Sequence, residues 1–111
     1  HAAGDSVLRA VAGAIKRQLR NVDMVFRFGG EEFLILLSNT GRDAARMVGE
    51  RLRQAAQAQD YWVEGTRIEL TVSLGCSTLL AAESAESLLR RADNALYVAK
   101  REGRNRLAMA G

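Results

Sequence analysis

The sequence predicts an α+β fold, in which helices pack on a small, largely antiparallel sheet. Three stretches carry apolar residues at helical spacing, and short apolar or alternating runs lie between them. The predicted order is helix, strand, strand, helix, strand, helix, short strand. Runs of helices and strands that do not alternate strictly are typical of α+β domains.

Composition limits the class of protein. The chain has 111 residues, of which 48% are hydrophobic and 26% charged, and we expect residues 1–111 to form one soluble domain. A formal net charge of +3 suits phosphate ligands but is too small for a protein that coats a nucleic-acid polymer. The single cysteine excludes an intrachain disulfide, and no run of apolar residues is long enough to span a bilayer. We therefore expect a cytoplasmic location.

The first helix and the two strands after it form the first part of the fold. Asp5 or Ser6 is expected to cap the helix, whose apolar face comprises Val7, Leu8, Val11, Ala14, Ile15 and Leu19. Residues 24–28 and 33–37 are the predicted arms of a hairpin. Gly29 and Gly30 suit its tight connection, because glycine adopts positive φ without a steric cost. Two carboxylates therefore stand at the tip.

The second half repeats the alternation of helix and strand. Asn39 or Thr40 is expected to cap a helix with Ala44, Ala45, Val48, Leu52 and Ala55 inward, and residues 57–65 are expected to form a loop. Residues 68–76 alternate between apolar and polar, as in a strand with one buried face. Ser84 is expected to cap the last helix and Gly103 to end it, with a short strand at residues 107–109. The aromatic residues Tyr61, Trp62 and Tyr97 are expected in or beside the core.

This order resembles the ferredoxin-like βαββαβ sandwich without its first strand. That strand lies inside the complete sheet, so the remaining strand edges are expected to pair with another chain.

Four motifs together resemble one family, the GGDEF-domain diguanylate cyclases. They are His-Ala-Ala-Gly-Asp at residues 1–5, Gly-Gly-Glu-Glu-Phe at 29–33, Thr-Val-Ser-Leu-Gly at 71–75 and Arg-Ala-Asp-Asn-Ala-Leu-Tyr-Val-Ala-Lys-Arg-Glu-Gly-Arg-Asn at 91–105. The resemblance implies a palm-type domain lacking its first strand and first helix. It also implies condensation of two GTP molecules into cyclic di-GMP with loss of two pyrophosphates, which requires a second GGDEF domain facing the first.

The resemblance assigns roles to residues near the acidic hairpin. Glu31 would bind Mg²⁺ or Mn²⁺ and accept the proton of the attacking ribose hydroxyl, and Glu32 would support the same metal. Gly29 and Gly30 would lie against the ribose and phosphates, and Asp5 would form hydrogen bonds with the guanine base. From the residues alone, the glutamates indicate a soluble hairpin tip and Asp5 a helix cap, and the accompanying motifs favour the site roles.

Two sets of cations complete the implied sites. Lys100 and Arg104 would bind the triphosphate, although cations at a helix C-terminus also stabilise the helix itself. Arg20 and Asp23 form an Arg-x-x-Asp sequence where the family carries its product-inhibition site, and Arg51 would contact the same product. Solvated charges at a helix end remain the alternative.

The absence of the family's first strand and first helix lowers the activity that we expect. The resemblance places a metal-binding aspartate and a guanine-reading asparagine there, so we expect little cyclase activity from these 111 residues. We expect an upstream sensory domain in the parent protein, which can be membrane-tethered. The alternative function is a catalytically inactive cyclic di-GMP receptor, and His1 is expected to be structural only.

Overall fold

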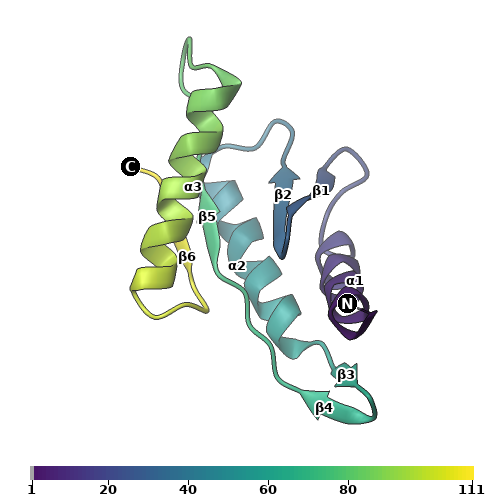
Figure 1. Cartoon of the computed structure of the whole chain (residues 1–111). Coiled ribbons are helices and arrows are strands. Elements are labelled where there is room, and N and C mark those ends of the chain that lie inside the picture. The colour runs from purple at the N-terminus through teal and green to yellow at the C-terminus, as the bar shows by residue number, and fades with distance from the viewer. Residues whose placement is uncertain (1) are drawn as a thin grey trace.

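The computed structural model describes residues 2–111, so His1 lies outside the described residues. The order of elements confirms the α+β prediction and adds one hairpin (Figure 1). The elements are α1 (Ala2–Lys16), β1 (Met24–Gly29), β2 (Glu32–Leu36), α2 (Arg42–Ala58), β3 (Tyr61–Val63), β4 (Thr66–Ile68), β5 (Leu74–Cys76), α3 (Ala85–Arg101) and β6 (Leu107–Met109).

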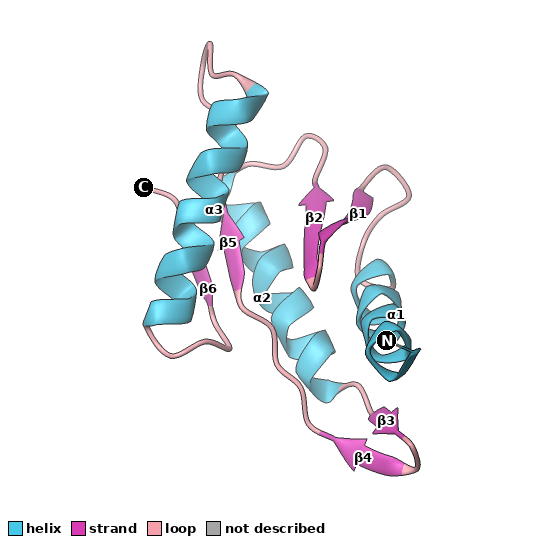
Figure 2. Cartoon of the chain, in the orientation of Figure 1, coloured by secondary structure: helices cyan, strands magenta, loops and turns pink. Residues whose placement is uncertain are grey.

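The strands form three separate pairs. β1 and β2 are antiparallel, β3 and β4 are antiparallel, and β5 and β6 are parallel. Figure 2 shows α3 lying along β5 and β6, while α2 lies between these strands and the β1–β2 hairpin. Within residues 2–111 no hydrogen-bonded ladder joins β2 to β5.

The hairpin turn is displaced by one residue from the predicted position. Gly29 pairs with Glu32, so the connecting residues are Gly30 and Glu31 rather than the two glycines. The displacement comes from a bulge, because the register shifts between Arg27 and Gly29 and leaves Phe28 unpaired. Gly29 therefore serves the bulge and Gly30 the turn.

The predicted strand over residues 68–76 is divided in the structure. β4 ends at Ile68, β5 begins at Leu74, and residues 69–73 have no strand partner in the part of the chain described. The alternation is still expressed in packing, because Ile68, Leu70, Val72 and Leu74 lie against the core. The expected loop over residues 57–65 is also corrected, since it contains the end of α2 and most of the β3–β4 hairpin.

Two of the three predicted helix starts differ from the structure. Asp5 lies in the first turn of α1 rather than at its cap, and Gly41 rather than Asn39 or Thr40 is the N-cap of α2. Ser84 caps α3 as predicted, because its Oγ accepts a hydrogen bond of 3.1 Å from the backbone N–H of Ser87. Among the described residues, no helix is both long enough and apolar enough to cross a membrane.

The core joins α1, α2 and the β3–β4 hairpin. Its buried centre comprises Val11, Ile15, Leu52 and Tyr61, and the hydroxyl of Tyr61 donates a 2.6 Å hydrogen bond to the carbonyl of Ala56. Only one of the three aromatic residues expected at the core is buried. Tyr61 is 1% exposed, whereas Trp62 and Tyr97 are 59% and 62% exposed.

β5 lies unusually close to α3. A Cβ at Gly75 would lie 2.2 Å from both the carbonyl oxygen of Ala92 and the backbone nitrogen of Leu96. No side chain fits in that space without moving the strand or the helix. The next residue, Cys76, is half-buried; its carbonyl accepts a 2.8 Å hydrogen bond from the N–H of Ala110, and burial raises the pKa of its thiol.

Candidate functional site

The acidic hairpin tip is built on two glycines in the left-handed half of conformational space. Gly29 has φ +138° and Gly30 has φ +40°, and neither a Cβ at Gly29 nor one at Gly30 would meet an atom within 4 Å. The glycines are therefore required by the backbone, and the space beside them is open. Glu31, in the turn, and Glu32, at the start of β2, are both exposed.

Arg27 fixes the shape of this turn and connects it to α1. Its Nε and Nη2 donate hydrogen bonds of 3.0 and 2.9 Å to the carbonyl of Gly30, and its Nη1 lies 3.6 Å from Oδ1 of Asp5. The structure thus brings Asp5 beside the hairpin. No sequence motif assigns a role to Arg27, although a single arginine inside an apolar hairpin arm is a usable signal.

The two glutamates have the chemistry of a partial magnesium site. Mg²⁺ in phosphate-transfer sites is held by one or two protein carboxylates together with phosphate oxygens and water. Glu31 and Glu32 fit that pattern as exposed acids beside open space. No group of three or more His, Cys, Asp and Glu side chains gathers anywhere in residues 2–111.

The implied triphosphate cations lie in and just after the last turn of α3. Lys100 lies in the last turn, and Arg104 and Asn105 both have positive φ, of +61° and +45°. Non-glycine residues adopt this conformation only when neighbouring contacts hold them. The side chain of Asn105 accepts a 2.8 Å hydrogen bond from Arg53, and its backbone N–H donates one of 3.2 Å to Ser73.

The hairpin turn, the start of α1 and the end of α3 lie toward the same end of the molecule (Figure 1). In the described part of the chain, however, neither hydrogen bonds nor ion pairs join Lys100 or Arg104 to Glu31 or Glu32. The elements that carry the implied substrate residues therefore lie toward one side of the fold, and within residues 2–111 the acids and cations do not contact one another directly.

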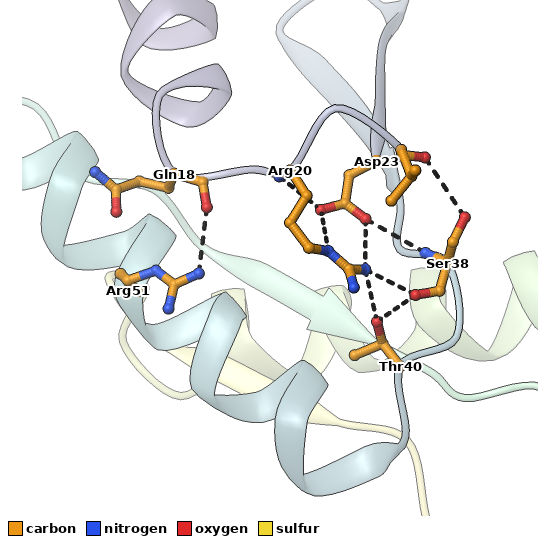
Figure 3. A network of polar contacts seen from close by, with 7 residues as sticks. Gln18, Arg20, Asp23, Ser38, Thr40 and Arg51 are labelled. Atoms are coloured by element: carbon orange, nitrogen blue, oxygen red, sulfur yellow. Dashed lines mark hydrogen bonds and ion pairs between the residues drawn. The ribbon is translucent and has the colours of Figure 1, made fainter.

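The Arg-x-x-Asp residues form a dense network at the opposite end of the hairpin (Figure 3). Arg20 donates from Nε and Nη2 to the carboxylate of Asp23 at 3.1 and 2.8 Å, and Nη2 also donates to the carbonyl of Ser38 and to Oγ1 of Thr40. The Asp23 carboxylate also accepts from the backbone N–H groups of Arg20 and Ser38. The arginine lowers the pKa of Asp23 to about 2 and its own pKa is raised in return.

Arg51 reaches the same region from α2. Its Nη2 donates a 3.2 Å hydrogen bond to the carbonyl of Gln18, which lies two residues before Arg20 (Figure 3). The structure therefore gathers all three residues of the implied product site around the segment that follows α1.

A second ion pair holds the loop between β5 and α3. Arg91 donates to both carboxylate oxygens of Glu83 at 2.7 Å and to the carbonyl of Thr78 at 2.6 Å. This pairing lowers the pKa of Glu83 to about 2. Arg91 opens the longest motif in the sequence, and here its contacts are within the chain.

Comparison with known proteins identifies the family. The family model described as "Diguanylate cyclase, GGDEF domain" matches residues 1–106. Diguanylate cyclase A of Treponema denticola is 45% identical over 99% of this chain, which spans 30% of that relative's length.

Solved structures agree with this match. The diguanylate cyclase SiaD of Pseudomonas aeruginosa, solved with its activator SiaC, superposes with a TM-score of 0.94 at 37% identity, over 99% of this chain and 42% of SiaD. The GGDEF domain of DgcB from Caulobacter crescentus, solved with cyclic di-GMP, gives a TM-score of 0.89 at 34% identity, over 99% of this chain and 66% of the DgcB chain. The sequence, the fold and the glycine-glutamate hairpin agree, and the chain belongs to the GGDEF family of diguanylate cyclase domains.

Proposed function

We propose that residues 1–111 act as one unit that binds GTP and contributes to its condensation into cyclic di-GMP. The observation that carries this proposal is the acidic turn. Arg27 stabilises the turn by donating to the Gly30 carbonyl, and it also contacts Asp5 on α1. A rigid turn with open space beside its glycines suits an approaching nucleotide. Relatives named diguanylate cyclases support the same reaction.

Each residue has a stated role in this reaction. Glu31 and Glu32 hold Mg²⁺ or Mn²⁺, which when bound neutralises phosphate charge, and Glu31 accepts the proton of the ribose 3′-hydroxyl. The freed oxygen attacks the α-phosphorus of a GTP on a second, facing domain, and pyrophosphate leaves. Two such attacks close the ring.

The ends of the substrate are held by other groups. Asp5 accepts hydrogen bonds from the N1 and amino group of guanine, which adenine cannot supply. Its ion pair with Arg27 is exposed and 3.6 Å long, so little free energy opposes this exchange. Lys100 and Arg104 bind the triphosphate as a point charge and a planar fork, respectively.

We further propose that Arg20, Asp23 and Arg51 bind the product and inhibit the reaction. The ordered network around Arg20 supports a preformed anion site. The same network supports a second candidate function, a cyclic di-GMP receptor without catalytic activity. That receptor binds cyclic di-GMP but not GTP.

Calorimetry with the α-thio analogue of GTP and Mg²⁺ tests the substrate site on the 111-residue chain. Lys100→Ala and Arg104→Ala are each expected to weaken binding about 10- to 100-fold, as loss of one charge-assisted hydrogen bond does. Arg101→Ala is the matched control, because it removes the same charge one residue away, where the guanidinium instead lies 5.8 Å from the ring of Tyr97.

The outcomes separate the two functions. An equal loss for Arg101→Ala and Lys100→Ala would show nonspecific charge attraction and contradict the site. No binding of the GTP analogue together with tight binding of cyclic di-GMP would favour the receptor. A loss of metal-dependent binding in Glu31→Gln supports the metal role.

A further inference from the structure

The Arg20 guanidinium is held along one edge and free along the other. Nε and Nη2 make all of its hydrogen bonds within residues 2–111, to Asp23, to the Ser38 carbonyl at 2.7 Å and to Thr40 Oγ1 at 3.1 Å. Nη1 has no partner in that part of the chain. Since the side chain is 55% exposed, Nη1 is the donor that a ligand can reach.

The hydroxyl of Thr40 has a fixed direction in this network. A hydroxyl carries one hydrogen, and Thr40 donates it to the Ser38 carbonyl at 2.8 Å. Toward Arg20 it therefore presents a lone pair. Nη2 has two hydrogens for three acceptors, so one of them is shared between Thr40 and a neighbouring acceptor. Thr40 thus connects Nη2 of the guanidinium to the Ser38 carbonyl that also accepts from it, as Figure 3 shows.

Asp23 is saturated by the chain's own donors. Its carboxylate accepts from Nε, Nη2 and the backbone N–H of Arg20 and from the N–H of Ser38, and its side chain is 3% exposed. Within the proposed product site, Asp23 therefore holds the Arg20 guanidinium in place. The free Nη1 edge is left as the recognition element.

We propose that Thr40 is a positioning residue of the product site, which orients the Arg20 fork and so sets the affinity for cyclic di-GMP. This inference rests on the proposed binding of cyclic di-GMP at Arg20. The segment Ser38–Thr40 lies between β2 and α2, so product affinity depends on a loop outside the Arg-x-x-Asp sequence. Because the guanidinium is already oriented before binding, less free energy is lost in ordering the Arg20 side chain when the ligand binds.

The test compares three conservative variants by calorimetry with cyclic di-GMP. Thr40→Val keeps the shape and removes the acceptor, and its affinity is expected to fall about 5-fold, as for one net hydrogen bond. Thr40→Ser keeps the hydroxyl and is expected to bind within about 2-fold of the parent chain. Ser38→Ala is the control, because Arg20 uses only the backbone carbonyl of that residue.

A second readout separates positioning from loss of fold. Urea unfolding of each variant sets conditions in which it is fully folded, and the GTP analogue at the other end of the hairpin is expected to bind Thr40→Val and the parent equally. Equal cyclic di-GMP affinities for Thr40→Val and the parent would overturn the inference. If Arg20→Ala also binds as the parent does, the product site itself is wrong; if Arg20→Ala alone loses affinity, only the role of Thr40 fails.

Discussion

Replacing Gly75 with alanine is expected to separate β5 from α3. The added Cβ would lie 2.2 Å from Ala92 O and from Leu96 N, and 2.7 Å from Leu96 Cα. Ordinary contact begins near 3.4 Å, so the two elements must move apart by 3.4 − 2.2 = 1.2 Å. All three atoms belong to the backbone of a helix, and no rotamer change can relieve them.

The expected cost is about 3 kcal/mol or more of the free energy of unfolding, at or above the upper end for overpacked cores. Urea denaturation followed by circular dichroism measures it. Two other glycines give a graded control. Gly13→Ala meets only Arg17 Nη1 at 3.4 Å and should gain about 0.5–1 kcal/mol from helix propensity, whereas Gly49→Ala meets the flexible Leu107 Cδ2 at 3.0 Å and should change little. A Gly75→Ala protein within about 1 kcal/mol of the parent would refute the reasoning.

Three further predictions follow from single contacts. Glu83→Gln should lower the free energy of unfolding at pH 5–7 relative to the parent. The pKa of Glu83 is about 2 in the fold against an ordinary 4.5, so the ionised carboxylate stabilises the protein above that range. This stabilisation is lost as the pH falls through that range, and the difference between the two proteins should therefore shrink as acid titrations approach pH 2. Tyr61→Phe should cost about 1–2 kcal/mol in urea unfolding, because it leaves the buried Ala56 carbonyl without its donor; an unchanged midpoint would contradict this. Arg27→Lys keeps the charge but not the double contact with the Gly30 carbonyl, and should weaken binding of the GTP analogue about 3- to 10-fold in calorimetry.

Local patterns predicted the elements better than their partners. The inward face of α2 was predicted only in part, because Ala44 is exposed whereas Gly49 and Ala56 are buried. The alternation over residues 68–76 gave the correct buried side, yet residues 69–73 have no paired strand, because pairing depends on which segment lies alongside. In the hairpin, the two glycines were expected to form the turn, but only Gly30 lies in it and Gly29 ends β1. The bulge at Phe28 then moved the turn by one residue, and no periodicity encodes such an insertion.

The candidate site divides in the same way. Short motifs predicted the acids at the hairpin tip and the cations at the end of α3, but not the residues that contact the neighbouring backbone and side chains. Arg27 contacts Asp5, 22 positions earlier in the chain, and Arg53 contacts Asn105, 52 positions later. Thr40 was expected to cap α2 and instead binds Arg20, because Gly41 takes the cap position. Such contacts are set by the tertiary fold.

The half-buried thiol of Cys76, beside Gly75, is a natural probe for local opening of the fold. Cys76 is the only cysteine, and its carbonyl accepts a hydrogen bond from the N–H of Ala110, the residue after β6. Burial raises its pKa and so suppresses the reactive thiolate, which means that a thiol reagent should react much faster once β5 and β6 part. The rate of labelling, followed without any engineered probe, therefore measures how often this region opens. A ligand bound by Lys100 and Arg104 would be detected as slower labelling of a residue that it does not touch.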